Sequence, residues 1–162
     1  EAGVGRATVY RHWPRLTDLL MDALADAALV VDFGEGDLRT QLLHELGQRL
    51  PQINSPMSMA LVGMLVGRGE YDDDVQQLRT VIFGRVVDAL SKVIAAAARH
   101  GQLVSDAPAG ELARIILGAL LMQRSLLGQD LTFDYLERVV DASLRGWWRD
   151  TEASVTDRIT TI

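Results

Sequence analysis

The sequence contains no cysteine, which excludes disulfide bonds, thiolate zinc sites and cysteine nucleophiles. Its three histidines, His12, His44 and His100, lie in separate segments without the paired spacing of a metal site. No apolar run approaches the ~18 residues that a membrane-spanning helix needs, and no basic-then-apolar leader opens the chain. We therefore expect a cytoplasmic protein that has no membrane partner and holds neither a metal nor another cofactor.

Signs of catalysis are also lacking. No glycine-rich stretch follows a strand pattern, so a nucleotide-binding fold is unsupported. Ser55, Ser58 and Ser125 have no evident base to activate them. The acidic run at residues 72–74 suggests a metal site, but carboxylates at a helix start are also stabilised by the helix dipole, which is the interpretation we favour. We expect a protein that is not an enzyme.

What the sequence does have is apolar residues at helical spacing along nearly its whole length, without alternating strand patterns. Asp37 and Ser55 are suited to cap the helices that follow them. Gly101 and Gly128 are suited to end helices, and we expect Pro51 to break one. The fold class is therefore all-α. The expected helices cover residues 6–12, 17–31, 38–50, 56–66, 72–99, 108–127 and 132–148.

The net charge of −6 argues at first against a nucleic-acid partner, because neutralising phosphates requires lysine and arginine. The charge is unevenly distributed, however. Arg6, Arg11 and Arg15 oppose only Glu1 at the start of the chain, and the remainder is acidic. A small basic segment on an acidic body permits DNA binding.

The short helix expected at residues 6–12 has the features of a DNA-reading element. Gly3 permits a tight turn before it, and Gly5 is an acceptable cap. Small and polar residues at its start suit insertion into a major groove, where arginine can reach a guanine edge and hydroxyls can hold phosphates. From spacing alone, an amphipathic helix with solvated arginines remains an equal alternative. The candidate DNA contacts in this helix are Arg6, Ala7, Thr8, Tyr10, Arg11 and His12.

Residues 2–13 read Ala2-Gly3-Val4-Gly5-Arg6-Ala7-Thr8-Val9-Tyr10-Arg11-His12-Trp13. This stretch resembles the end of the helix-turn-helix of the TetR family of bacterial transcriptional regulators. The usual family form is A-G-V-S-x-x-T-L-Y-x-H-F, followed by a turn and a K-E-x-L-like helix start. Two positions depart from it: Gly5 replaces a serine, and Leu16 stands where a cation usually contacts the DNA backbone. Arg15, one residue earlier, is the candidate substitute for that phosphate contact. The identical matches are Ala2, Gly3, Val4, Thr8, Tyr10 and His12, and Val9 and Trp13 match in kind.

This resemblance implies a ligand-responsive repressor that binds a pseudo-palindromic operator as a homodimer and is released by a small, largely apolar effector. Residues 1–31 are then the remainder of the DNA-binding domain, namely the recognition helix and a linking helix. Residues 32–162 form the effector-binding and dimerisation bundle. We expect further residues before Glu1 to complete the helix-turn-helix, and we expect these 162 residues alone not to bind an operator.

The resemblance also implies that the last two long helices pair with their counterparts in a second copy. The helix at 108–127 is apolar on several faces and must be covered on more than one side. Burial within the monomer is the alternative to a four-helix interface. The expected interface residues are Ile115, Ile116, Ala119, Leu120, Gln123, Leu127, Leu136, Val140, Leu144 and Trp147.

The effector site is expected among the helices between residues 17 and 105. Methionines there adapt to ligands of varied shape, and Arg85 is a candidate either to neutralise an acidic ligand or to extend into solvent. Ordinary core packing remains the alternative for these residues. The expected lining residues are Met57, Leu61, Met64, Phe83, Arg85, Val86 and Leu90.

Two other functions remain open. One is a helical protein that handles small molecules or lipids without binding DNA, and the other is a helical interaction module. Neither explains residues 2–13, and enrichment of a palindromic DNA site by the protein would separate both from a repressor.

Overall fold

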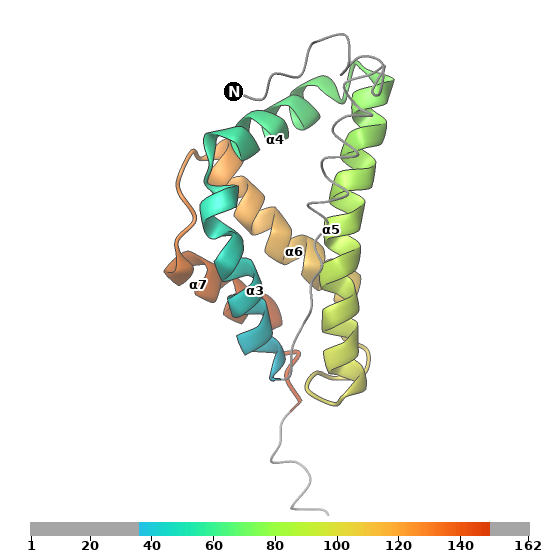
Figure 1. The fold of residues 1–162 in the computed structure, drawn as a ribbon. Coiled ribbons are helices and arrows are strands. Elements are labelled where there is room, and N and C mark those ends of the chain that lie inside the picture. Colours follow the sequence, from blue (N-terminus) through green and yellow to red (C-terminus); the bar gives the residue numbers. More distant parts are fainter. Residues whose placement is uncertain (1–35, 150–162) are drawn as a thin grey trace, which may run out of the picture.

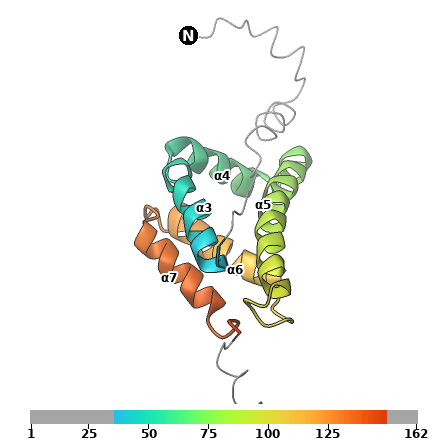
Figure 2. The ribbon, with the colours of Figure 1, turned by 60° about the horizontal axis from the view of Figure 1, so that its bottom comes forward.

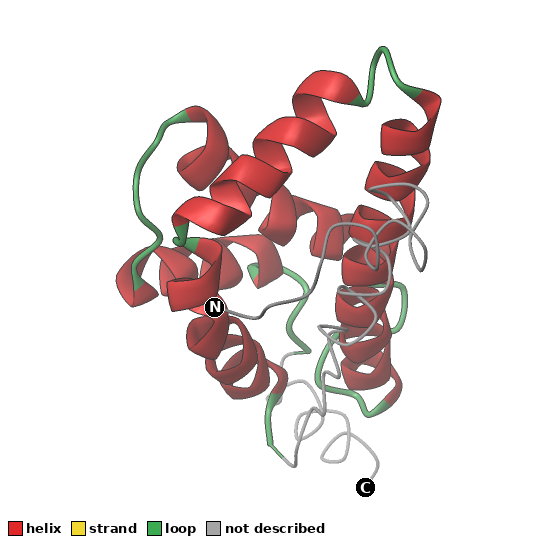
Figure 3. Cartoon of the chain, turned by 45° about the horizontal axis from the view of Figure 1, so that its top comes forward, coloured by secondary structure: helices red, strands yellow, loops and turns green. Residues whose placement is uncertain are grey.

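The computed structural model describes residues 36–149, which form helices joined by loops without a named strand (Figures 1 and 3). The prediction of an all-α fold is therefore confirmed for these residues. The segments expected to be helical at 6–12 and 17–31 lie outside the described residues. The elements are α3 (Leu38–Ile53), α4 (Pro56–Arg68), α5 (Asp73–Arg99), α6 (Ala109–Leu121), the π-helical turn η1 (Met122–Leu126) and α7 (Phe133–Leu144).

Four helices begin at side-chain caps, which satisfy backbone N–H groups that have no partner inside a helix. Asp37 and Ser55 accept hydrogen bonds from the backbone N–H of Thr40 and Ser58, as the sequence predicted. The hydrogen bonds from Thr40 also lower the pKa of Asp37. The other two cap bonds run from the N–H of Val75 to Asp72 and from the N–H of Tyr135 to Thr132.

Two expected helix ends are wrong. α3 continues through Pro51 to Ile53, since an exposed proline near a helix end removes one backbone hydrogen bond and need not stop the helix. α7 ends at Leu144, not at residue 148, because Arg145 leaves the helical conformation with a ψ of 127° and Gly146 follows it with a left-handed φ of 87°. The chain then turns back, and the Trp147 carbonyl accepts a hydrogen bond from the N–H of Val104 at 2.9 Å.

The main core lies between α3, the C-terminal half of α5, α6 and α7 (Figure 2). α6 contacts both α5 and α7, so several of its faces are covered within one chain. α3 packs on the other side of α7. The residues that are fully shielded from solvent here are Leu42, Ile94, Leu103, Ala113, Ile116, Leu136, Val140 and Leu144.

A second, smaller apolar cluster lies between α4 and the N-terminal half of α5. Its buried members are Leu65, Val75 and Leu78. α4 also contacts the end of α3 and the π-helical turn, but it makes no contact with α6 itself. In Figure 1, α4, α5 and α6 consequently form three sides of a triangle.

Arg39 ties α3 to α7 on the surface of the main core. Its guanidinium lies 2.6 Å from Asp141 Oδ1 and 2.6 Å from Glu137 Oε1. The hydrogen bonds from Arg39 lower the pKa of Asp141. These side chains are partly exposed, so the ion pairs fix the geometry of α7 more than they stabilise the fold.

No helix within residues 36–149 is long and apolar enough to cross a membrane.

The substitution Leu136→Ala tests the position of the main core. Leu136 is completely buried between α7 and its neighbours, so its truncation is expected to lower the free energy of unfolding by about 2–5 kcal/mol. Urea denaturation at fixed protein concentration measures the change. Tyr71→Ala is the matched control, because Tyr71 is 90% exposed and its loss should change the unfolding free energy little. Equal effects of the two substitutions would contradict this core.

Candidate functional site

The residues expected to contact DNA lie outside the part of the chain that the structure describes. They are Arg6, Ala7, Thr8, Tyr10, Arg11, His12 and Arg15. The candidate sites within residues 36–149 are those of the helical body.

The residues expected to bind an effector are separated by the fold. Leu61, Met64 and Phe83 pack against the small cluster, while Leu90 is buried in the main core and is therefore not available to a ligand. Val86 is half-buried on α5. The prediction that Met57 and Arg85 line an effector site is wrong. Met57, in the first turn of α4, is 78% exposed. Arg85 is also exposed because it lies on the solvent side of α5. Arg85 therefore extends into solvent, the second of its two expected roles.

Each of the three helices of the triangle carries half-buried apolar side chains. Several of them pack at the edge of one of the two apolar clusters: Ile82 and Phe83 at the small cluster, and Val87 and Leu117 at the main core. This region retains Leu61, Met64, Phe83 and Val86 from the expected set. Its full membership is Met59, Leu61, Val62 and Met64 on α4, Ile82, Phe83, Val86 and Val87 on α5, and Leu117 and Leu121 on α6.

Most residues expected at a dimer interface face inward. The helical periodicity correctly identified apolar faces, but other helices of the same chain cover those faces. Five residues expected at the interface therefore belong to the core of the monomer: Ile116, Leu120, Leu136, Val140 and Leu144.

The others occupy mixed positions. Trp147 packs partly buried on the same core, beyond the end of α7. Ala119 is half-buried, and its carbonyl accepts a hydrogen bond from the Tyr135 hydroxyl. Gln123 donates to Gln129 at 2.7 Å. Only Ile115 and Leu127 are exposed.

An exposed apolar stripe runs along α6 and into the π-helical turn. Ile115 is 54% exposed and Leu126 is 69% exposed, and Met122 lies between them at helical spacing. Gly118 is also exposed, and nothing lies within 4 Å of the position of an added Cβ there. We refer to Ile115, Gly118, Met122 and Leu126 as the α6 stripe. Met122 and Leu126 were not among the expected interface residues, although both continue the spacing of Ile115.

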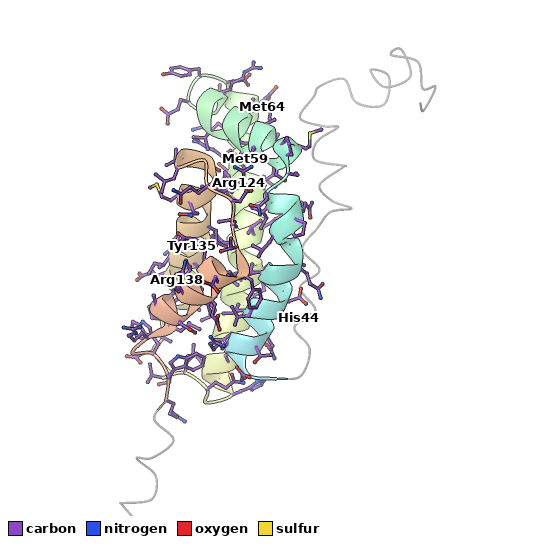
Figure 4. The ribbon with its side chains drawn as sticks, turned by 90° about the vertical axis from the view of Figure 1, so that its left-hand side faces the viewer. His44, Met59, Met64, Arg124, Tyr135 and Arg138 are labelled. Atoms are coloured by element: carbon purple, nitrogen blue, oxygen red, sulfur yellow. The ribbon has the colours of Figure 1, made fainter. Side chains whose placement is uncertain are left out.

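Arg124 is a further charged group that the sequence analysis missed. Its side chain is 15% exposed and lies between the π-helical turn and the junction of α3 with α4 (Figure 4). Nη2 donates to the backbone carbonyl of Asn54 at 2.8 Å. The contact from Nη2 to Asp130 Oδ1 is 3.7 Å, and the buried Nε has no hydrogen-bond partner. A lone arginine within the apolar segment 116–127 was the available signal.

Asn54 connects this junction to the loop before α7. Its side-chain amide donates to the Leu131 carbonyl at 2.9 Å, and its Oδ1 accepts from the Leu131 N–H at 2.9 Å. With the bond from Arg124, Asn54 binds both the π-helical turn and the loop before α7. The start of α4 is therefore attached to the connection between α6 and α7.

Within residues 36–149, no group of three or more histidine or acidic side chains is arranged to hold a metal ion. The described site groups are thus apolar side chains and one buried guanidinium. Such groups bind molecules by burial and by charge pairing.

Comparison with protein families identifies the helical body. A family model described as "Tetracyclin repressor-like, C-terminal domain" matches residues 32–143, which is more than half of the chain. The matched range contains α3 to α6 and all of α7 except its last residue. Comparison with curated proteins finds no match.

Replacing Asn54 by alanine tests the attachment of the α3–α4 turn. Both hydrogen bonds to Leu131 are lost, which should lower the free energy of unfolding by about 1–3 kcal/mol. Hydrogen exchange followed by NMR should show faster exchange of the Leu131 amide. Gln48→Ala is the control, since Gln48 pairs only with the exposed His44 side chain. An unchanged Leu131 exchange rate in Asn54→Ala would contradict this role.

Proposed function

This chain belongs to the TetR family, and from that membership we propose that it is part of a ligand-responsive transcriptional regulator. The observation that carries the proposal is the order of two features along one chain. A segment resembling the family's recognition helix, residues 2–13, directly precedes a body matched by the family's C-terminal domain at residues 32–143. Neither a lipid-handling bundle nor an interaction module accounts for both.

The proposed protein binds a pseudo-palindromic operator in the cytoplasm as a homodimer and acts as a repressor. Arg6, Ala7, Thr8, Tyr10 and Arg11 would contact DNA in each copy, with His12 and Arg15 near the backbone. Two recognition helices about 34–36 Å apart read successive major grooves. An effector that binds better to a different spacing would release the DNA.

The proposed dimer uses the α6 stripe, not the buried residues of α6 and α7. Exposed apolar side chains at Ile115, Met122 and Leu126 favour association because covering them removes apolar surface from water. Gly118 permits close approach of a partner helix.

The proposed effector site is the half-buried apolar region of α4, α5 and α6. The region borders both apolar clusters along α5, so a ligand there would alter how α4 is held against the main core. The apolar lining favours an effector with a largely apolar body. Residues with flexible side chains, such as Met59 and Met64, would adapt to it.

The substitution Ile115→Glu tests the dimer. Burying a carboxylate in an apolar interface is unfavourable, so the dissociation constant is expected to rise by about 10-fold or more. Sedimentation equilibrium measures this constant. Thr80→Glu, on the exposed face of α5, is the control and should leave it unchanged. A wild-type chain that is monomeric at every concentration, or equal constants for the two variants, would contradict the proposal.

Selection from a random DNA pool tests the regulator function, using the protein expressed from its whole gene. A pseudo-palindromic site should be enriched, and Arg6→Ala should weaken binding to it by about 5- to 150-fold, as loss of a base contact does. Arg68→Ala, an exposed arginine of the body, should not weaken it. If no sequence is enriched, the regulator proposal fails and a small-molecule-handling protein becomes the better account.

A further inference from the structure

We propose that Arg124 anchors a binding site for a small carboxylate with an apolar body, at the junction of α3, α4 and the π-helical turn. Its use as the regulatory signal rests on the function proposed above, whereas the binding itself rests on the contacts of Arg124. The expected occupant is a monocarboxylate, since one guanidinium offers a planar pair of N–H groups that matches one carboxylate.

The first support is the incomplete pairing of a buried charge. A guanidinium has five N–H donors, and Arg124 uses one of them in a hydrogen bond, to the Asn54 carbonyl. Its Nε is shielded from solvent without a partner. Burying a charge is unfavourable unless it is paired and hydrogen-bonded, so this arginine has capacity for a further acceptor.

The second support is the contrast with other arginines of the same fold. Arg39 and Arg49 are more exposed than Arg124, and each contacts a carboxylate within 2.7 Å. Among the ion-paired arginines of residues 36–149, Arg124 is the most buried and has the longest contact, at 3.7 Å. Its partner Asp130 is 74% exposed and contributes little at that distance.

The third support is the backbone around Arg124. The N–H of Leu127 donates to the Met122 carbonyl, five residues earlier, which defines a π-helical turn. Such turns are rare and are found frequently at functional sites. Here the turn places Arg124 against the α3–α4 junction while Met122 and Leu126 remain exposed.

The surroundings favour an apolar body for the ligand. Half-buried apolar side chains lie on the helices that meet at this junction: Ile53, which packs against the main core at the end of α3, Met59 in α4 and Leu121 at the end of α6. Figure 4 shows Met59 on the α4 side of Arg124. A carboxylate bound to Arg124 would place its tail beside these helices, and it would compete with the distant Asp130 for the guanidinium.

Calorimetric titration of the chain with straight-chain carboxylates from butanoate to dodecanoate, each compared with the alcohol of equal length, tests the site. At least one carboxylate is expected to bind more tightly than its alcohol. Arg124→Gln should weaken that carboxylate about 10-fold or more, because a charge-assisted hydrogen bond is lost, and leave the alcohol unchanged. Arg138→Gln, which removes an exposed arginine paired with Asp134, should affect neither.

The substitution Asp130→Asn distinguishes ligand binding by Arg124 from a purely structural role, because a structural role would not change the affinity for a carboxylate. Removing the competing carboxylate should tighten binding of the ligand carboxylate severalfold, and this arm decides the question if Arg124→Gln does not fold. The proposal is overturned if no carboxylate exceeds its alcohol, if Arg124→Gln binds as wild type, or if Asp130→Asn leaves the affinity unchanged. Since no DNA is present, failure here leaves the regulator proposal standing, and failure of DNA selection leaves the carboxylate site standing.

Discussion

The structure depends on the long helix α5, which contributes side chains to two separate apolar clusters. The C-terminal half of α5 contributes Leu90, Val93, Ile94 and Ala97 to the main core, while its N-terminal half supports the small cluster under α4. The main core is closed by α3, α6 and α7, whose inward faces are almost completely shielded. The α4 end lacks such cover, since α4 rests on α5 and on the π-helical turn without contacting α6. The helical body thus has a closely packed main core and an α4 end that is less completely covered.

Polar contacts also join the two parts at the α3–α4 turn: Ser58 Oγ donates to the Gln52 carbonyl, and the others meet at Asn54. Its side chain binds the loop before α7, and its carbonyl binds Arg124. A negative charge bound at Arg124 would act on this attachment and therefore on how α4 lies relative to α6. The proposed effector region and the proposed α6 stripe both border the same connection, which gives a short physical route between ligand and partner surface.

The helix caps were predictable from the sequence, but the sequence did not show which element covers each apolar helix face. Asp37 and Ser55 cap helices because capping depends only on neighbouring residues. Ile116 and Leu136 were recognised as buried, yet helical periodicity cannot tell whether a face is covered by its own chain or by a second copy. The predicted ends of α3 and α7 were wrong for opposite reasons. α3 continues past Pro51 because the helix tolerates the loss of one hydrogen bond there. α7 was predicted too long because the apolar pattern continues to Trp147 after the helix has ended. Arg124 escaped notice because its burial depends on a π-helical turn that sequence periodicity does not reveal.

In the proposed regulator, a small molecule bound by the body controls the affinity of the protein for DNA. Fluorescence anisotropy of a labelled operator, obtained by selection and titrated with the whole-gene protein, measures this most directly when a bound carboxylate is present at saturation. The carboxylate is expected to raise the operator dissociation constant by about 5-fold or more, as a coupling between two sites requires, and Arg124→Gln is expected to abolish this effect. An operator affinity that the saturating carboxylate leaves unchanged would rule out ligand control through Arg124.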